Sequence, residues 1–258
     1  MNEIATTANT EKIDTKNSLD TILPDANPTI KSENLWKICG ADDLPPHIEN
    51  MKPENSLISY APTFLQPYIE NISNVKADGN CGFRCVAILL GKKEDQWPEI
   101  RKELMEEMER NKILYQNLYG VKDYERNLQV VNWKSGPCSV DKWMIMPDFG
   151  HLIANKYKRP LHFFSSLDSS TFLPLSSAPS GNSSWSILLS NTHFYPLKLK
   201  LHALLPPIAI EWEGCAQPIA LYWKETYSKM NAVTYSKMNV VEADLTIDLT
   251  KMKFNMKI

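Results

Sequence analysis

The feature that most constrains this chain is a glycine-containing turn that runs straight into an apolar segment, residues 78–90 (DGNCGFRCVAILL). Gly91 follows, and an apolar run closed by a glycine predicts a short buried helix that begins near Cys81. The free backbone N–H groups and the positive dipole end at a helix start favour thiolate. We therefore expect the Cys81 thiol to have a pKa below its free value of about 8.5.

A histidine far along the chain is a candidate catalytic partner of this cysteine. His193 follows the apolar run 185–189 (WSILL) and precedes two aromatic residues. The run is short, rich in aromatic and aliphatic residues and bounded by Ser and Asn, so it predicts a buried strand that ends near His193. A histidine at a strand end can face a helix start, and such Cys and His partners are adjacent in the fold rather than in the chain.

Three motifs in this order resemble a known family. Residues 78–84 resemble the nucleophile motif of the ovarian-tumour (OTU) cysteine proteases, and His193 with its two aromatics resembles that family's histidine motif. Residues 143–155 (WMIMPDFGHLIAN) are similar to the family's middle helices, which precede a strand such as 161–164. The resemblance covers roughly residues 70–200 and looks most like OTU domains of mobile-element-derived proteins. It implies an α+β papain-like fold, a small central β-sheet flanked by helices, and cleavage of ubiquitin or ubiquitin-like conjugates.

The proposed chemistry gives each residue a task. Cys81 attacks the scissile carbonyl, and His193 takes its proton and later gives one to the leaving lysine amine, as in a cysteine-type deubiquitinase. The backbone N–H groups of Asp78, Gly79, Asn80 and Cys81 would stabilise the oxyanion, where one donor is typically worth about 3 kcal/mol. No cofactor or metal is required. Cys81 and Cys85 share a helix face, but no further Cys/His pair at zinc-ligand spacing accompanies them.

The residue that orients His193 is open. Many OTU enzymes have Asp or Asn two positions after the histidine, whereas this chain has Tyr195, which does not accept a hydrogen bond as a carboxylate does. Asn191, two positions before, would point to the same side of a strand as His193. Asp78 is the other candidate, and it could instead brace the turn by accepting backbone N–H bonds. A catalytically degenerate OTU domain that binds ubiquitin or another partner is therefore the alternative function.

Charge, apolar runs and cysteine count narrow the class of protein further. The net charge is −2 with scattered Lys and Arg, so no basic field for nucleic acid is evident. No apolar run approaches the roughly 20 residues of a membrane span, and the first residues lack a signal-peptide layout. Five cysteines at irregular spacing argue against a disulfide framework. We expect an intracellular protein of the cytoplasm or nucleus, monomeric and without membrane contacts, whose partners are ubiquitin or ubiquitin-like conjugates.

The chain divides into four predicted regions. Residues 1–33 are polar and predicted to be disordered, and 34–69 form an N-terminal extension that packs on the domain. Residues 70–205 form the OTU-like catalytic domain. Residues 206–258 form a C-terminal extension, in which 226–231 (TYSKMN) recurs as 234–239, a repeat too short for a solenoid.

Local patterns predict the main elements. Helices are expected over 65–72, from Trp97 with Pro98 in its first turn, and from 147 or 148 to about 158. Strands are expected over 161–165, 185–189 and 193–199. The Ser-, Pro- and Gly-rich residues 166–184 are expected to form a loop, either facing the substrate or mobile.

Overall fold

The computed structural model describes residues 54–231. The predicted disordered segment 1–33 and the second repeat copy 234–239 lie outside the described residues.

A five-stranded sheet has the strand order β1-β5-β4-β2-β3. Its strands are β1 (Ile69–Ile72), β2 (Leu161–Ser165), β3 (Ser170–Phe172), β4 (Trp185–Ser190) and β5 (His193–Leu199). β2 and β4 are parallel, and the other neighbouring pairs are antiparallel. The strands predicted over 161–165, 185–189 and 193–199 are confirmed.

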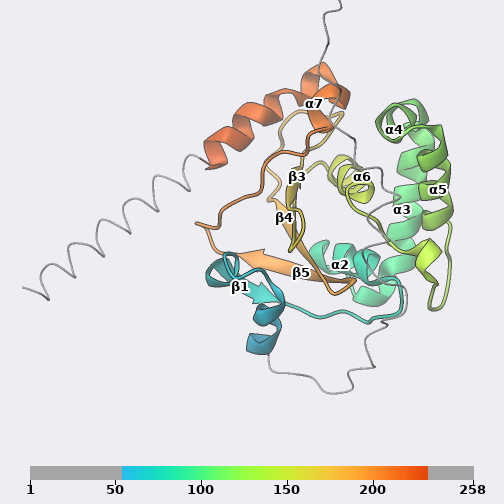
Figure 1. The fold of residues 1–258 in the computed structure, drawn as a ribbon. Helices are drawn as coiled ribbons and strands as arrows, with labels where there is room; N and C mark the ends of the chain where they lie inside the picture. The colour runs from blue at the N-terminus through green and yellow to red at the C-terminus, as the bar shows by residue number, and fades with distance from the viewer. Residues whose placement is uncertain (1–53, 232–258) are drawn as a thin grey trace, which may run out of the picture. The chain divides into compact units, whose positions relative to one another are not determined.

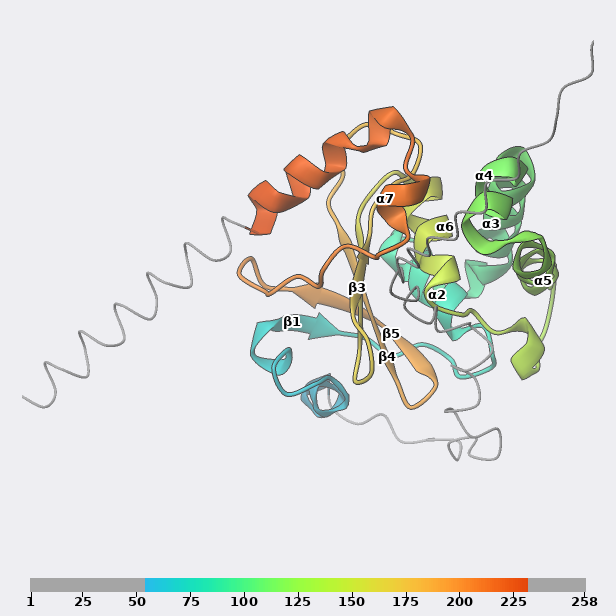
Figure 2. The ribbon, with the colours of Figure 1, turned by 45° about the horizontal axis from the view of Figure 1, so that its top comes forward.

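Helices complete the α+β architecture: a short α7 (Trp212–Cys215) and a group of five that lie between Cys81 and Tyr157 in the chain. The five are α2 (Cys81–Leu89), α3 (Trp97–Arg110), α4 (Lys112–Tyr119), α5 (Val121–Val131) and α6 (Asp148–Tyr157). Figures 1 and 2 show these five together on one side of β3 and β4. The helices predicted to begin near Cys81, at Trp97 and near Asp148 are confirmed.

Two local predictions are wrong. Within the helix expected over 65–72, only Gln66–Tyr68 form a 3-10 turn (η3), and the residues that follow pair with β5 as strand β1. The apolar spacing there suits a helix, but hydrogen bonds to a strand far along the chain decide the outcome. Residues 166–184 are not all loop either, because Ser170–Phe172 pairs with β2.

Both faces of the central strands β2 and β4 are buried, which explains why these two strands are mostly apolar. On one face Leu161 and Ile187 belong to a core that includes Phe83 of α2 and Phe149 of α6. On the other face Phe164, Leu188 and Tyr195 pack with Leu65 and its neighbours from the segment before β1. α2 packs against β5 and α3, and this packing brings the helix start beside the start of β5.

Residues 206–209 lie along the outer edge of β3. The Thr171 N–H donates to the Pro207 carbonyl (2.7 Å), and the Ala209 N–H donates to the Thr171 carbonyl (2.9 Å). Trp212 and Trp223 are buried beyond this edge. This part of the predicted C-terminal extension therefore packs on the core, while the domain boundary at residues 205/206 stays a prediction. None of the helices in residues 54–231 is both long and apolar enough to cross a membrane.

Candidate active site

Cys81 is the first residue of α2, and the turn before it requires glycine. Gly79 has φ +82°, a left-handed conformation that side chains other than glycine rarely adopt. A Cβ at Gly79 would lie 2.4 Å from the Cys138 carbonyl oxygen and 2.7 Å from the Trp143 indole nitrogen. The turn therefore fits closely against the loop of residues 133–143, and this contact fixes where α2 begins.

Asp78 braces this turn. Its carboxylate accepts hydrogen bonds from Arg84 (Nη2–Oδ2 2.6 Å, Nε–Oδ1 3.2 Å) and from the backbone N–H of Asn80 (3.1 Å). Burial acts to raise the pKa of Asp78, but the hydrogen bonds from Arg84 and Asn80 and the Arg84 charge outweigh it and hold the pKa below its usual value. Both carboxylate oxygens are thus engaged away from His193. Asp78 is predicted either to orient His193 or to brace the turn, and the geometry supports the second role.

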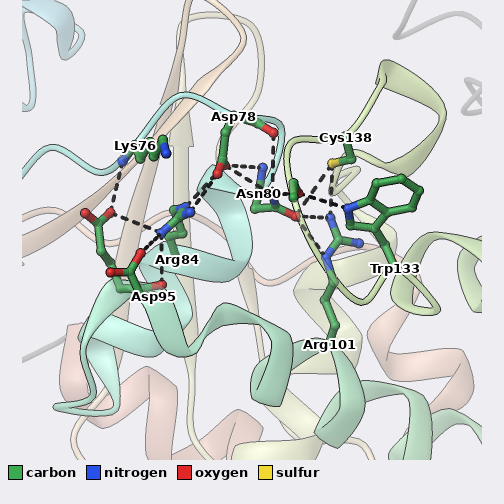
Figure 3. Close-up of polar contacts among 10 residues, drawn as sticks. Lys76, Asp78, Asn80, Arg84, Asp95, Arg101, Trp133 and Cys138 are labelled. Atoms are coloured by element: carbon green, nitrogen blue, oxygen red, sulfur yellow. Dashed lines mark hydrogen bonds and ion pairs between the residues drawn. The ribbon is translucent and has the colours of Figure 1, made fainter.

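Asn80 links the turn to the helical layer, as Figure 3 shows. Its Oδ1 accepts hydrogen bonds from Arg101 Nε (3.2 Å) and Nη2 (2.8 Å). Its Nδ2 donates to the Gly136 carbonyl (3.1 Å) and to Asp78 Oδ1 (3.2 Å). The side chain is completely buried, so each of these bonds is shielded from water.

His193 opens β5 directly after a two-residue hairpin turn. Asn191 and Thr192 form the turn, with φ of +49° and +64°, and Ser190 pairs with His193 across the hairpin. Asn191 is exposed in this turn, so the premise that it shares a strand face with His193 does not hold. A different residue contacts the imidazole. Nε2 of His193 lies 3.1 Å from Oδ1 of Asn74.

Sequence reasoning missed Asn74. It lies between β1 and the nucleophile turn, and its Oδ1 also accepts a hydrogen bond from the Val75 N–H (2.9 Å). Because the same oxygen accepts both bonds, Nε2 of a neutral His193 carries the ring proton and Nδ1 has the free lone pair. Asn74 and His193 are 119 residues apart in the chain. No local pattern signals such a pairing.

The ionisation expected for Cys81 is wrong for this conformation. The residue is 9% exposed, and burial raises the pKa of the Cys81 thiol to about 11, although hydrogen bonds from the backbone of Phe194 and Gly82 act in the opposite direction. His193 is 8% exposed, and burial lowers the pKa of its imidazole to about 4. The two groups are therefore neutral at pH 7. The hydrogen bond to Phe194 nevertheless places the sulfur beside the residue that follows His193 in β5.

The turn offers fewer free oxyanion donors than the sequence suggested. The Asp78 N–H donates to the Lys76 carbonyl (3.2 Å), and the Asn80 N–H donates to the Asp78 carboxylate (3.1 Å). Both groups serve the turn itself. Of the four backbone N–H groups predicted to form the oxyanion hole, those of Gly79 and Cys81 are not used by the turn in this way.

Solved structures similar to this chain are OTU domain proteases. The viral OTU domain protease of Dera Ghazi Khan virus is 16% identical over 53% of this chain and 84% of its own, with a TM-score of 0.39. The Farallon virus OTU domain protease is 18% identical over 53% and 87%, also at 0.39. The Hazara virus OTU, solved bound to ubiquitin, is 17% identical over 53% and 84%, at 0.37.

No family model matches the chain, and no curated protein matches it. In residues 54–231 no three His, Cys, Asp or Glu side chains gather as metal ligands would.

Proposed function

We propose that this chain is a thiol isopeptidase that hydrolyses ubiquitin or ubiquitin-like conjugates. Cys81 is the nucleophile, His193 is the general base and acid, and Asn74 orients the imidazole. The hydrogen bond between Asn74 and His193 carries the proposal, because an amide oxygen that accepts from Nε2 orients the imidazole and leaves Nδ1 to act as the base toward Cys81, the first residue of α2. The substrate class follows from the resemblance of residues 78–84 to the OTU nucleophile motif.

The resting pair is neutral, so the thiol loses its proton only during attack. With a thiol pKa of about 11 and an imidazole pKa of about 4, prior transfer to the ring is uphill by several kcal/mol. The Cys81 proton passes to His193 Nδ1 as the Sγ–C bond forms, and backbone N–H groups donate hydrogen bonds to the new oxyanion. The C–N bond then breaks, and the imidazolium protonates the lysine amine. Water hydrolyses the thioester by the same route.

A ubiquitin-propargyl probe tests this assignment directly. We expect the full-length chain to form a covalent adduct at neutral pH, detected by mass spectrometry, and Cys81→Ala and His193→Ala to form none. Cys85→Ala, one helical turn further along α2 and fully buried, is the matched control and should still react. A folded wild type without an adduct would overturn the proposal, and an adduct in Cys81→Ala would move the nucleophile elsewhere.

A second function is favoured by one observation. The covered, neutral Cys81 and His193 are also what a binding domain without catalysis would show. In that case isothermal titration calorimetry should detect ubiquitin binding, equal for wild type and Cys81→Ala, with no adduct from either protein. Hydrolysis of a ubiquitin-rhodamine substrate by the wild type would exclude a binding domain without catalytic activity.

A further inference from the structure

Arg101 of α3 is a buried cation without a carboxylate partner among the described residues. It is 1% exposed, and an unpaired buried charge is expensive unless its hydrogen bonds are satisfied. Its donors instead reach three oxygens and one thiol sulfur: Asn80 Oδ1, the Lys142 carbonyl (3.0 Å), the Val130 carbonyl and Cys138 Sγ (3.4 Å). The guanidinium also lies 3.7 Å from the centre of the Phe83 ring. No local pattern signals this arrangement, because Arg101 falls among the charged residues of an amphipathic helix.

The guanidinium fixes the side-chain amide of Asn80. Two of its N–H groups converge on Oδ1, so the amide can point its Nδ2 only toward Gly136 and Asp78. Because Arg101 also binds the Lys142 carbonyl, it ties the nucleophile turn to the loop that packs against it. A lysine has no planar fork and could not hold both positions in this way.

Fixing Asn80 also fixes the peptide that joins it to Cys81. The Asn80 carbonyl accepts the Arg84 N–H (2.9 Å), the first hydrogen bond of α2. In a planar trans peptide the N–H of the next residue points opposite to that carbonyl. The Cys81 N–H therefore points out of the helix start, where an oxyanion would lie. Arg101 thus acts on this donor through Asn80, without touching the substrate.

We propose that Arg101 is a positioning residue that aligns the Cys81 N–H as an oxyanion donor, an inference that rests on the proposed isopeptidase function. Its charge is also close enough to interact with a Cys81 thiolate. Burial lowers the pKa of Arg101 to about 10, so the group remains protonated at neutral pH. Its loss should affect a step in which charge develops on the substrate oxygen more than it affects substrate binding.

The test compares Arg101→Lys with Glu107→Gln in the full chain. Glu107 lies on the same helix and holds a separate buried network with Tyr115 and Asn155, so its variant should lower stability without disturbing the turn. With ubiquitin-rhodamine we expect Arg101→Lys to lower kcat at least tenfold and to change KM less than twofold. Glu107→Gln should keep both values within twofold of wild type. An unchanged kcat in folded Arg101→Lys, or a loss shared by Glu107→Gln, overturns the proposal.

The Cys81 backbone amide gives a readout that does not require activity. In ¹⁵N-resolved spectra, Arg101→Lys should shift the Cys81 amide signal and speed its hydrogen exchange, whereas Glu107→Gln should leave both as in wild type. If Arg101→Lys changes neither the Cys81 amide signal nor its hydrogen-exchange rate, the positioning role is refuted. A wild type that hydrolyses nothing refutes the proposed function separately, and the amide result still decides whether Arg101 holds the turn.

Discussion

Acid should destabilise this domain through a histidine buried in the sheet. His162 of β2 is buried, and its Nδ1 lies 3.0 Å from the Thr171 hydroxyl oxygen. That hydroxyl donates to the Pro206 carbonyl (2.8 Å), so it accepts the proton of Nδ1, and Nε2 is buried without a partner. A second proton on Nε2 would be a buried, unpaired charge. Burial accordingly lowers the pKa of His162 to about 4.

The magnitude follows from proton linkage. The unfolded chain binds a proton near pH 6.5 and the folded chain only near pH 4, so the unfolded state holds more protons between these values. Stability contributed by neutral His162 is therefore complete above pH 6.5 and is lost as the pH falls toward 4. The pKa difference corresponds to about 3 kcal/mol, and the buried His193 adds a loss of the same order in the same window.

The assay is urea unfolding at several pH values for wild type and His162→Asn. Asparagine keeps a donor where Nδ1 lies and does not titrate, but it leaves a small cavity. The variant should therefore be less stable than wild type at pH 7, and the difference should shrink by about 3 kcal/mol by pH 4. A difference that stays constant over this range would refute the argument that His162 is folded in its neutral form.

Three further predictions, two of them with a matched control substitution, test the geometry. Gly79→Ala should lower the free energy of unfolding by about 2 kcal/mol in urea titrations, because its Cβ would meet the facing loop; Gly91→Ala, also at positive φ but in open space, should cost about 1 kcal/mol. Asn74→Ala should lower kcat for ubiquitin-rhodamine about tenfold and Asn191→Ala should not, and equal effects would contradict the assignment of the orienting residue. Trp212→Ala should cost about 4 kcal/mol in the same titrations, because the ring is completely buried; a loss below 1 kcal/mol would show that this segment adds little to the core.

The sequence predicted those elements whose pattern is local. The runs 161–165 and 185–189 are buried on both faces, so they are short and mostly apolar. The helix from Trp97 carries its own start signal and apolar stripe. β1 escaped prediction because Leu65, Ile69 and Ile72 are spaced as on a helix, and its strand form depends on β5. β3 has three residues, too few for a period to appear.

The candidate site also contains residues with a local sequence signal and residues that depend on long-range contacts. Cys81, His193 and the glycine turn stand in motifs and could be named from the sequence. Asn74 could not, because its contact with His193 exists only after β1 and β5 pair. The ionisation of Cys81 was misjudged for a related reason. A helix start is visible in sequence, whereas the burial that raises the thiol pKa depends on how α2 packs against β5.

The covering of β3 by residues 206–209 has a consequence for how copies of this chain behave together. A terminal strand with unused N–H and C=O groups is a template on which a strand of another molecule can add, and such addition leads to aggregation. Here the backbone N–H and C=O of Thr171 are both hydrogen-bonded within the same chain, to Pro207 and Ala209. A protein cut before residue 206 would expose this template, and we would expect it to precipitate rather than merely melt at a lower temperature.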